Sequence, residues 1–310
     1  MRVKFSMYTA ALAALAVPSA FGSPAYTFTI LTPGGTVNEF NGGGINNNGV
    51  VVDLVNSHLF TYDINANIYT NYNTIFPSQM GSIDDLGRIV YTSQSGSNFV
   101  GTVYNPATNS TTTFLDPNAT QYTFANGVSG NGNLIAGYYL DAGFNQIGFE
   151  KNGATFTDVS YPGPHGQIYL WDTNNLGHIV GQSSCCRAGV NFLDKGGVYT
   201  TIFDPLGSPK NGSVLGLNDL DQAVGWYDDG VGGPIHGMLW QAGVSTTIDL
   251  PGATRTVLRD INDSGVILGG AIVNGNSVLF VATPTAPEPA SCILIGGALC
   301  VFGLRLRRKA

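Results

Sequence analysis

Between residues 23 and 286, apolar and polar side chains alternate over short stretches. Residues 155–159 and 256–259 show the pattern clearly, with Thr, Phe, Val and Leu interleaved with polar positions. A period of two is typical of half-buried β-strands. Ala, Glu, Lys, Leu and Arg at helical spacing are sparse in this region, which excludes helical bundles and coiled coils. The pattern predicts an all-β fold.

One turn motif recurs through the strand-rich region. It reads apolar-Asx-polar-polar-Gly-x-apolar-apolar-small, and its turn position is occupied in succession by Gly49, Gly87, Gly132, Gly177, Asp221 and Gly265. The steps between these positions are 38, 45, 45, 44 and 44 residues. Asx side chains cap their own backbone, and Gly accepts positive φ, so each copy predicts a tight turn.

A proline-containing marker alternates with the turn motif. Its prolines are Pro33, Pro77, Pro117, Pro162, Pro205 and Pro251, at steps of 44, 40, 45, 43 and 46 residues. A unit of this length holds roughly four strands once short connections are allowed. Both series therefore have the period of a propeller blade.

The order of the two markers predicts how the ring closes. The region begins with a proline marker at residues 26–35 and ends with two strands, 266–270 and 277–283, after a turn marker. The first segment therefore supplies the missing half of the last unit. We predict a six-bladed β-propeller spanning residues 23–284, with seven blades as the alternative, in which N- and C-terminal strands share one blade and so protect the sheet edges.

Composition and charge exclude further classes. The chain is 43% hydrophobic and 11% aromatic, enough to bury a core and argue against disorder. Residues 23–286 contain 7 basic and 19 acidic residues, a formal charge of −12. Nucleic-acid binding requires a cationic surface for counterion release, so we expect no nucleic-acid partner.

The N-terminus has the pattern of an export signal. Residues 1–22 combine a cationic start, an apolar run at 7–17, and the small residues Ala20 and Gly22. The apolar run is too short to span a bilayer, which needs roughly 20 residues. We predict a signal peptide, with the secretion translocon and signal peptidase as partners.

The C-terminal segment, residues 285–310, contains three elements in a fixed order. Pro287, Glu288 and Pro289 precede an apolar stretch, predicted as a single helix at 291–304, and a basic cluster at 305–309 follows that contains Arg305, Arg307 and Arg308. A positive cluster holds a terminus on the cytoplasmic side while the apolar segment lies in the bilayer. That arrangement leaves the Pro-Glu-Pro motif exposed to a protease.

This tail resembles the PEP-CTERM sorting signal of Gram-negative bacteria. The resemblance implies recognition by an exosortase-type membrane protease, transient residence in the inner membrane, and delivery to the outer surface or extracellular matrix, often in association with exopolysaccharide. Cys292 and Cys300 inside the apolar run depart from the usual pattern. They are open to two interpretations, lipidation or small apolar filler.

The repeated units resemble HAF-type extracellular repeats. The best match is residues 235–254, where His236, Leu239 and Trp240 precede the run Thr247 to Gly252. Residues 148–163 and 191–207 keep the pattern loosely. The resemblance covers nearly the whole region between the termini and carries no general activity.

Local catalytic and metal-binding motifs are not found in the sequence. His58, His165, His178 and His236 fall in different units, without partners at metal-ligand spacing. Acidic residues at 84–85, 219–221 and 228–229 make calcium a candidate cofactor, and the loop from Asp228 to Gly230 is the first candidate site. The competing interpretation is that these side chains cap the backbone in turns. We assign no catalytic or metal residue and expect no other cofactor.

Cys185 and Cys186 are adjacent in a segment expected to be oxidised after export. Three states are open: a vicinal disulfide, free thiols, or an intermolecular bond. Adjacent Cα atoms lie about 3.8 Å apart, below the usual disulfide range, so the ring would be strained.

Equivalent loops of a propeller emerge on one face, which brings variable segments together. Aromatic rings beside carboxylates suit stacking and hydrogen bonding of sugars. The predicted ligand-binding rim consists of Tyr138, Tyr139, Asp141, Arg187, Trp226, Tyr227, Asp228 and Asp229. The alternative interpretation is a set of scattered exposed aromatics.

The sequence thus predicts an exported cell-surface or matrix protein with a binding or structural propeller, associated with polysaccharide. It is more consistent with a non-enzyme than with an enzyme. A polysaccharide-active enzyme with a central pocket is the alternative, and it would require two carboxylates near the axis at a suitable separation.

Overall fold

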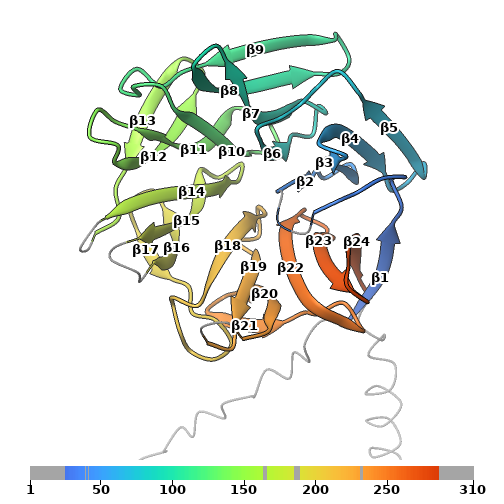
Figure 1. Ribbon diagram of the computed structural model, residues 1–310. Helices are drawn as coiled ribbons and strands as arrows, with labels where there is room; N and C mark the ends of the chain where they lie inside the picture. Colours follow the sequence, from blue (N-terminus) through green and yellow to red (C-terminus); the bar gives the residue numbers. More distant parts are fainter. Residues whose placement is uncertain are drawn as a thin grey trace, which may run out of the picture. The chain divides into compact units, whose positions relative to one another are not determined.

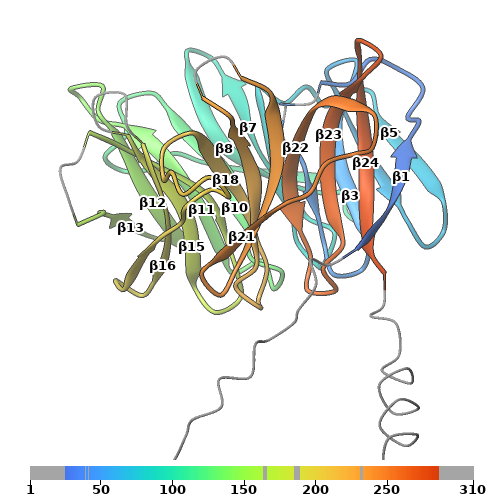
Figure 2. The ribbon, with the colours of Figure 1, turned by 90° about the horizontal axis from the view of Figure 1, so that it is seen from below.

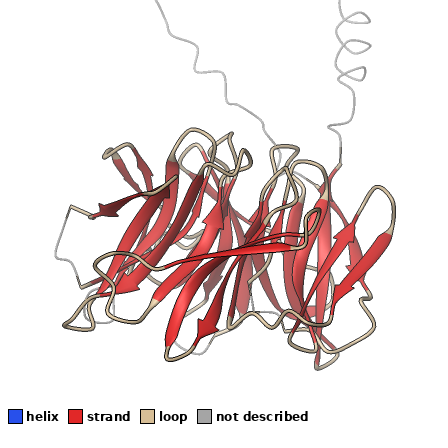
Figure 3. Ribbon diagram, turned by 90° about the horizontal axis from the view of Figure 1, so that it is seen from above, coloured by secondary structure: helices blue, strands red, loops and turns tan. Residues whose placement is uncertain are grey.

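The computed structural model describes residues 25–285 except 39, 41, 163–165, 185–188 and 231–232. The predicted signal peptide and residues 286–310 of the predicted sorting segment, with Pro287, Glu288, Pro289 and the predicted helix, lie outside the described residues. So do His165, Cys185, Cys186 and Arg187. Residues Tyr26–Thr285 fold as one unit of strands and loops (Figure 3). No helix in the described ranges has the length and apolar character needed to cross a membrane.

Four sheets contain four antiparallel strands each, paired in chain order. The first comprises β2 (Gly44–Ile45), β3 (Val50–Val55), β4 (His58–Asp63) and β5 (Ile68–Tyr72). The second comprises β6 (Gln79–Ile83), β7 (Ile89–Ser95), β8 (Asn98–Asn105) and β9 (Ser110–Phe114). The third comprises β10 (Thr123–Val128), β11 (Leu134–Leu140), β12 (Gln146–Asn152) and β13 (Thr155–Val159). The fourth comprises β14 (Gln167–Thr173), β15 (His178–Ser184), β16 (Val190–Lys195) and β17 (Tyr199–Thr201).

A fifth sheet has eight strands and divides into two groups of four. One group comprises β18 (Gly212–Leu217), β19 (Ala223–Asp228), β20 (Ile235–Gln241) and β21 (Val244–Thr247). The other comprises β22 (Ala253–Ile261), β23 (Ile267–Val273), β24 (Asn276–Pro284) and β1 (Tyr26–Leu31). Between the groups, the β20–β22 register contains one parallel residue pair, Ile235 with Arg255. The predicted four-strand unit is therefore confirmed in the four separate sheets.

The predicted closure between the two ends of the unit is confirmed. Strand β1 pairs antiparallel with β24 over its whole length, from Tyr26 opposite Pro284 to Leu31 opposite Leu279. The ring edge that would otherwise be open is thereby paired with a strand from the far end of the sequence. Figure 1 shows the sheets following one another around an axis, with β6, β10, β14, β18 and β22 innermost.

The predicted turns join the first and second strands of each unit. All six turn positions have positive φ, including Asp221 at φ 56 where the other units have Gly. Asp221 takes this conformation while its carboxylate contacts His178 and Lys195 of the preceding sheet, which holds the side chain in place.

The apolar cores lie between neighbouring sheets. One cluster joins Val180 and Leu193 of the fourth sheet to Val214 and Trp240 of the next unit. Another joins Leu31 and Leu279 to Val51 of the first sheet. In the view of Figure 2 the strands run through the thickness of the ring. Because the cores are between the sheets, the axis is free to carry polar side chains.

Candidate functional site: the axial cavity

A recurring β-bulge places side chains at the axis. The register of the innermost strands shifts between Ala125 and Gly127 in β10, and between Leu170 and Asp172 in β14. The same shift recurs in β18 and β22. A bulge inserts one unpaired residue and redirects its side chain. The inserted residues, all of which line the axial cavity, are Asn126, Trp171, Leu215 and Arg259.

The cavity has a volume of about 650 Å³, which is within the range of small-molecule sites. Its wall differs from unit to unit because each bulge carries a different side chain. Aromatic surface comes from Phe40, Trp171 and Trp226, with Phe40 and Trp226 packed edge to face at 6.2 Å between ring centroids. Gln79 and Asn126 are joined by a 2.9 Å side-chain hydrogen bond at the cavity wall.

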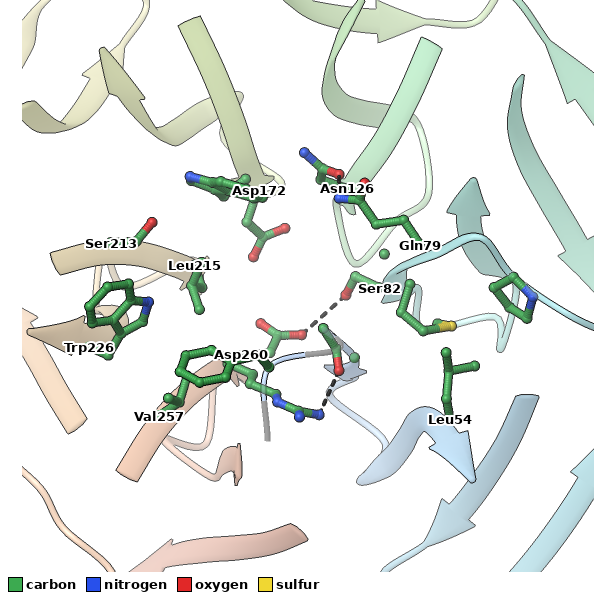
Figure 4. A pocket seen from close by; sticks show the side chains of 18 of the residues that line it. Leu54, Gln79, Ser82, Asn126, Asp172, Ser213, Leu215, Trp226, Val257 and Asp260 are labelled. Atoms are coloured by element: carbon green, nitrogen blue, oxygen red, sulfur yellow. Dashed lines mark hydrogen bonds between the residues drawn. The ribbon is translucent and has the colours of Figure 1, made fainter. Parts of the chain in front are cut away.

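Two buried carboxyl groups face the axis from β14 and β22. Figure 4 shows Asp172 and Asp260 directed toward the centre. Asp172 accepts hydrogen bonds at 2.8 Å from the backbone amides of Thr173 and of Leu217 in the next unit. Asp260 accepts 2.8 Å bonds from the amides of Ile261 and of Ile45 in the first unit. Each carboxyl therefore links its own inner strand to the following one.

Burial has a strong effect on the ionisation of both groups. It raises the pKa of Asp260 to about 7, against the lowering effect of the bonds from Ile45, Ile261 and Ser82. Burial, and secondarily the negative charge of Asp260, raises the pKa of Asp172 well above its ordinary value. Two like charges in one desolvated space resist simultaneous ionisation.

The small residues beside these carboxyls follow from the same geometry. A Cβ on Gly127 would lie 2.4 Å from Cα and from Oδ1 of Asp172. A Cβ on Gly216 would lie 2.6 Å from Cα of Asp260, and one on Gly44 would lie 2.9 Å from its Oδ2. Glycine next to each aspartate lets the neighbouring inner strand approach the carboxyl group.

The cation at the cavity, Arg259, is already neutralised. Its guanidinium donates to Asp53 Oδ2 of β3, and both side chains are almost fully buried. It also donates to the carbonyls of Gly42, at 2.6 Å, and of Asn38. Burial raises the pKa of Asp53 to about 6 although the Arg259 charge opposes that rise. Arg259 thus anchors the segment before β2 and does not leave a free positive charge for an anion.

Two polar atoms at the cavity have no partner within the described part of the chain. Trp171 Nε1 and Ser213 Oγ are buried and make no hydrogen bond there. Ser213 is only 6% exposed. Both atoms are covered by protein, so a ligand in the cavity would not reach them as the side chains stand, and the polar character of the wall comes from amide side chains such as Gln79, Asn126 and Gln182.

At the opposite end of the axis, the six turns form a closed belt of hydrogen bonds among described residues. Asn131 N donates to Asn175 Oδ1 at 2.7 Å, Asn175 N to Asp219, Asp219 N to Asp263, and Asp263 N to Asn47, each of the last three at 2.8 Å. Asn47 N then donates to Asp85 Oδ1, and Asp85 N to the Gly130 carbonyl, both at 2.8 Å. A pocket of about 40 Å³ inside the belt shares Ser82, Asp172 and Asp260 with the large cavity.

The belt gives a structural role to the acidic side chains of the turns, which were candidates for binding calcium. The Asp84 carboxylate accepts from Leu86 N and Arg88 Nε, and the Asp85 and Asp219 carboxylates accept backbone amides of neighbouring turns. In the residues that the structure describes, no group of three or more His, Cys, Asp or Glu side chains is placed to hold a metal ion.

The predicted rim is corrected in part. Tyr138, Tyr139 and Tyr227 are 8%, 2% and 5% exposed, so they do not offer free ring faces. They lie within β11 and β19, where the strands pack against neighbouring sheets; the Tyr227 hydroxyl contacts Thr247 Oγ1 at 2.7 Å. Trp226 lines the axial cavity.

The acidic members of the rim have separate environments. Asp141 is half-buried, and hydrogen bonds from Asn145 hold its pKa below the ordinary value. Asp228 is half-buried and Asp229 is exposed. Asp229 lies 3.4 Å from His236 Nε2, and the other nitrogen of that ring, Nδ1, lies 2.7 Å from Asp249 Oδ2.

Sequence reasoning missed the residues that define the cavity, chiefly Trp171, Asp172, Ser213, Arg259 and Asp260. A signal for four of them is present in the repeat. The two positions just before the apolar-Asx pair of each turn read Trp-Asp, Leu-Gly and Arg-Asp in the last three units. The residue types at these two positions differ between units, whereas the turn that follows them is regular. These are the positions where the inner strands approach the axis.

Comparison with protein-family models and with curated protein sequences gives no match. Solved structures share the arrangement of the sheets. A TolB from Acinetobacter baumannii superimposes with a TM-score of 0.50 at 10% identity, covering 79% of this chain and 65% of that one. A gluconolactonase from Xanthomonas campestris gives a TM-score of 0.54 at 11% identity, covering 84% and 90%. A chain of a mitotic checkpoint complex gives 0.50 at 8% identity, covering 91% and 100%.

The chain has a β-propeller fold. These proteins differ widely from one another and share the propeller architecture with this chain. Their sequence identities are so low that the similarity shows the fold alone. The function of this propeller has to be argued from its own cavity.

Proposed function

We propose that this protein is exported to the cell surface or extracellular matrix, and that its propeller is a non-catalytic module that binds a neutral saccharide in the axial cavity. The observation that carries the proposal is the lining of the cavity. Aromatic surface from Trp171 and Trp226 lies in the same wall as the amide side chains of Gln79, Asn126 and Gln182.

The chemistry of the wall favours a sugar over other small ligands. Aromatic faces pack against the apolar face of a sugar ring, while amides and hydroxyls such as Gln79, Gln182 and Ser82 offer hydrogen bonds to its hydroxyl groups. An anionic ligand is disfavoured, because Arg259 is engaged by Asp53 and the region 23–286 has a formal charge of −12.

The proposal includes a ring of six blades. Four four-stranded sheets account for four blades, and the eight-stranded sheet divides at the single pair Ile235–Arg255 into two more. The sixth blade is formed by β22, β23, β24 and β1, which is the shared blade that the marker order predicts.

The proposal also includes delivery. A signal peptide at residues 1–22 would direct the chain through the secretion translocon to signal peptidase, and the tail at 285–310 would be processed by an exosortase-type membrane protease. Its support is the order of motif, apolar stretch and basic cluster in the sequence.

A polysaccharide-active enzyme is the second candidate, and one observation favours it. Asp172 and Asp260 are two carboxyl groups at the axis, and burial raises the pKa of both. Against catalysis, both oxygens of each carboxyl accept hydrogen bonds from backbone amides of two inner strands. We therefore infer that Asp172 and Asp260 hold the inner strands in position.

The test uses the purified full chain. We expect binding on an array of neutral glycans, loss of that binding in Trp226→Ala, and no new reducing ends when the bound glycan is incubated with the protein. Release of reducing ends that is lost in Asp260→Asn would replace the binding function with the enzyme. Failure of every neutral glycan to bind would refute the proposed ligand class.

A further inference from the structure

Six aromatic rings form a continuous series that ends at the axial cavity. The ring centroids of Phe99 and Tyr122 are 5.7 Å apart, and those of Phe124 and Tyr138 are 4.7 Å apart. Tyr122 and Phe124 are linked at 6.4 Å, Tyr138 and Tyr169 at 5.0 Å, and Tyr169 and Trp171 at 5.9 Å. Trp171 is part of the cavity wall.

The series crosses three sheets at one set of strand ends. Phe99 is near the start of β8 and is bridged to Tyr122, just before β10. Phe124 pairs with Tyr138 across β10 and β11. Tyr169 and Trp171 belong to β14, the inner strand of the next sheet. The rings therefore lead inward across neighbouring sheets to the axis.

The outer rings retain accessible surface. Phe99, Tyr122, Phe124, Tyr169 and Trp171 are half-buried, whereas Tyr138 is buried beneath its neighbours. Phe99, Tyr122 and Phe124 have nearly parallel planes with centroids 5.7, 6.0 and 6.4 Å apart. Because the three nearly parallel rings are about equally far from one another, they form a triangle and are not stacked in a column. The three rings therefore do not cover all of one another's faces.

We propose that the five half-buried rings of this series form an aromatic track that binds a linear neutral glycan and leads one end of it into the axial cavity. The track is defined as Phe99, Tyr122, Phe124, Tyr169 and Trp171, and the buried Tyr138 packs between Phe124 and Tyr169. This inference rests on the proposed saccharide function of the cavity and extends it from a single sugar unit to a chain.

Charge and continuity select this occupant. Stacked aromatics also suit the bases of single-stranded nucleic acids, but such sites combine the rings with a cationic groove. Among the described residues the cation–ring contacts are on Phe40, Phe114 and Phe156, outside the track, and residues 23–286 have a formal charge of −12. A polymer is favoured over a small solute because the rings continue from the second sheet to the fourth. Trp171 belongs to both parts, because its ring stacks on Tyr169 and the residue also lines the cavity.

The experiment compares a short and a long ligand on the full chain. Cellobiose and cellohexaose are the probes, measured by isothermal titration calorimetry. We expect cellohexaose to bind more tightly than cellobiose, because only the longer oligomer reaches from the cavity along the track. Tyr122→Ala should weaken cellohexaose about 3- to 10-fold, the equivalent of one lost aromatic contact, and leave cellobiose unchanged.

Two further variants separate a lost contact from a lost fold. Tyr122→Phe retains the ring and should keep the affinity for cellohexaose. Phe203→Ala removes an aromatic side chain that is 49% exposed and lies outside the track, and it should change neither affinity.

The outcomes distinguish the track from the cavity. Equal binding of both oligomers, with no effect of Tyr122→Ala, would overturn the track and leave the cavity function standing. Loss of both ligands in Trp226→Ala together with the length effect of Tyr122→Ala supports both. Tight binding of a thymidine decanucleotide that Tyr122→Ala abolishes, without binding of cellohexaose, would reassign the track to nucleobases and overturn the proposal.

Discussion

The Asp260 carboxyl group accepts a hydrogen bond of 2.8 Å from the backbone amide of Ile45, a residue 215 positions earlier in the chain. This bond joins the inner strand of the last unit to that of the first. The β1–β24 pairing closes the same ring at its periphery. The ring is therefore closed at its periphery by a strand ladder and near its axis by a buried carboxyl group.

The first prediction concerns the pH dependence that Asp260 gives to stability. Its pKa of about 7 in the folded protein is above the ordinary 3.8, so the folded state binds the proton more tightly than the unfolded state does. Stability from this group is fully present below about pH 4 and is lost as the pH rises toward 7. One pKa unit corresponds to 1.36 kcal/mol, so the loss is at most about 4 kcal/mol.

Asp260→Asn should remove this dependence. Urea unfolding at intervals between pH 4 and pH 8 would give the difference in free energy of unfolding between wild type and variant. We expect the free energy of unfolding of the wild type to fall relative to that of the variant as the pH rises to about 7. Above that pH the difference should stay constant. Curves that run parallel over this range would show that Asp260 is ionised throughout.

The second prediction concerns closure at the periphery. Leu31 is 4% exposed and packs in a cluster with Val51 and Leu279, so it joins β1 to the first and last units. Leu31→Ala should lower the free energy of unfolding by about 2–5 kcal/mol, as expected for a large-to-small change in a core. Ile30, its neighbour on the same strand, is 49% exposed. Ile30→Ala is the matched control and should cost about 0.5 kcal/mol or less.

Equal effects of the two substitutions, measured by thermal and urea unfolding, would contradict a role for β1 in the core. A small effect of both would mean that β1 contributes little to the stability of the ring. A large effect of Leu31→Ala alone supports closure by side-chain packing as well as by the strand ladder.

Much of the fold was predictable because it depends on local, repeated features. The turns at Gly49 and Gly265 are set by the residues next to them, and the order of the markers was enough to predict that β1 completes the last sheet. The axial site was not predictable in the same way. Asp172 and Asp260 are 88 positions apart in the sequence and meet only because the inner strands converge.

The rim was partly wrong for a related reason. Tyr139 and Tyr227 occur in variable segments, but they lie inside strands and are buried there. Tyr138 and Tyr139 point to opposite faces of β11 and are both buried, so both faces of this strand are packed. Variability along the sequence located the correct region, whereas the direction of each side chain required the register.

The third prediction concerns the buried pair of Arg259 and Asp53. Removing one partner leaves a charge that is desolvated and unpaired, which typically destabilises a protein by about 3–5 kcal/mol. We expect Arg259→Met to have an effect of that size, because Asp53 and the carbonyls of Asn38 and Gly42 all lose a donor. Measurement by urea unfolding at pH 7.5 keeps the wild-type Asp53 largely ionised, given a pKa of about 6.

The double variant Asp53→Leu with Arg259→Met tests the origin of that loss. Because it removes both charges, we expect it to be more stable than Arg259→Met alone. The two substitutions should therefore be strongly non-additive. Additive losses would contradict the assignment of the single-variant effect to an uncompensated carboxylate.

The last prediction concerns delivery and uses the sequence of the tail. Glu288 is the central residue of the Pro-Glu-Pro motif and the acidic residue of the 285–310 segment. If an exosortase-type protease reads this motif, Glu288→Ala should accumulate as a longer, membrane-retained form on an immunoblot of fractionated cells. Asp141→Asn is the control, because it removes a carboxylate from the propeller and leaves the tail unchanged. Normal processing and release of Glu288→Ala would remove the support for sorting by this motif, while the propeller and its cavity would still have to be tested by their own ligands.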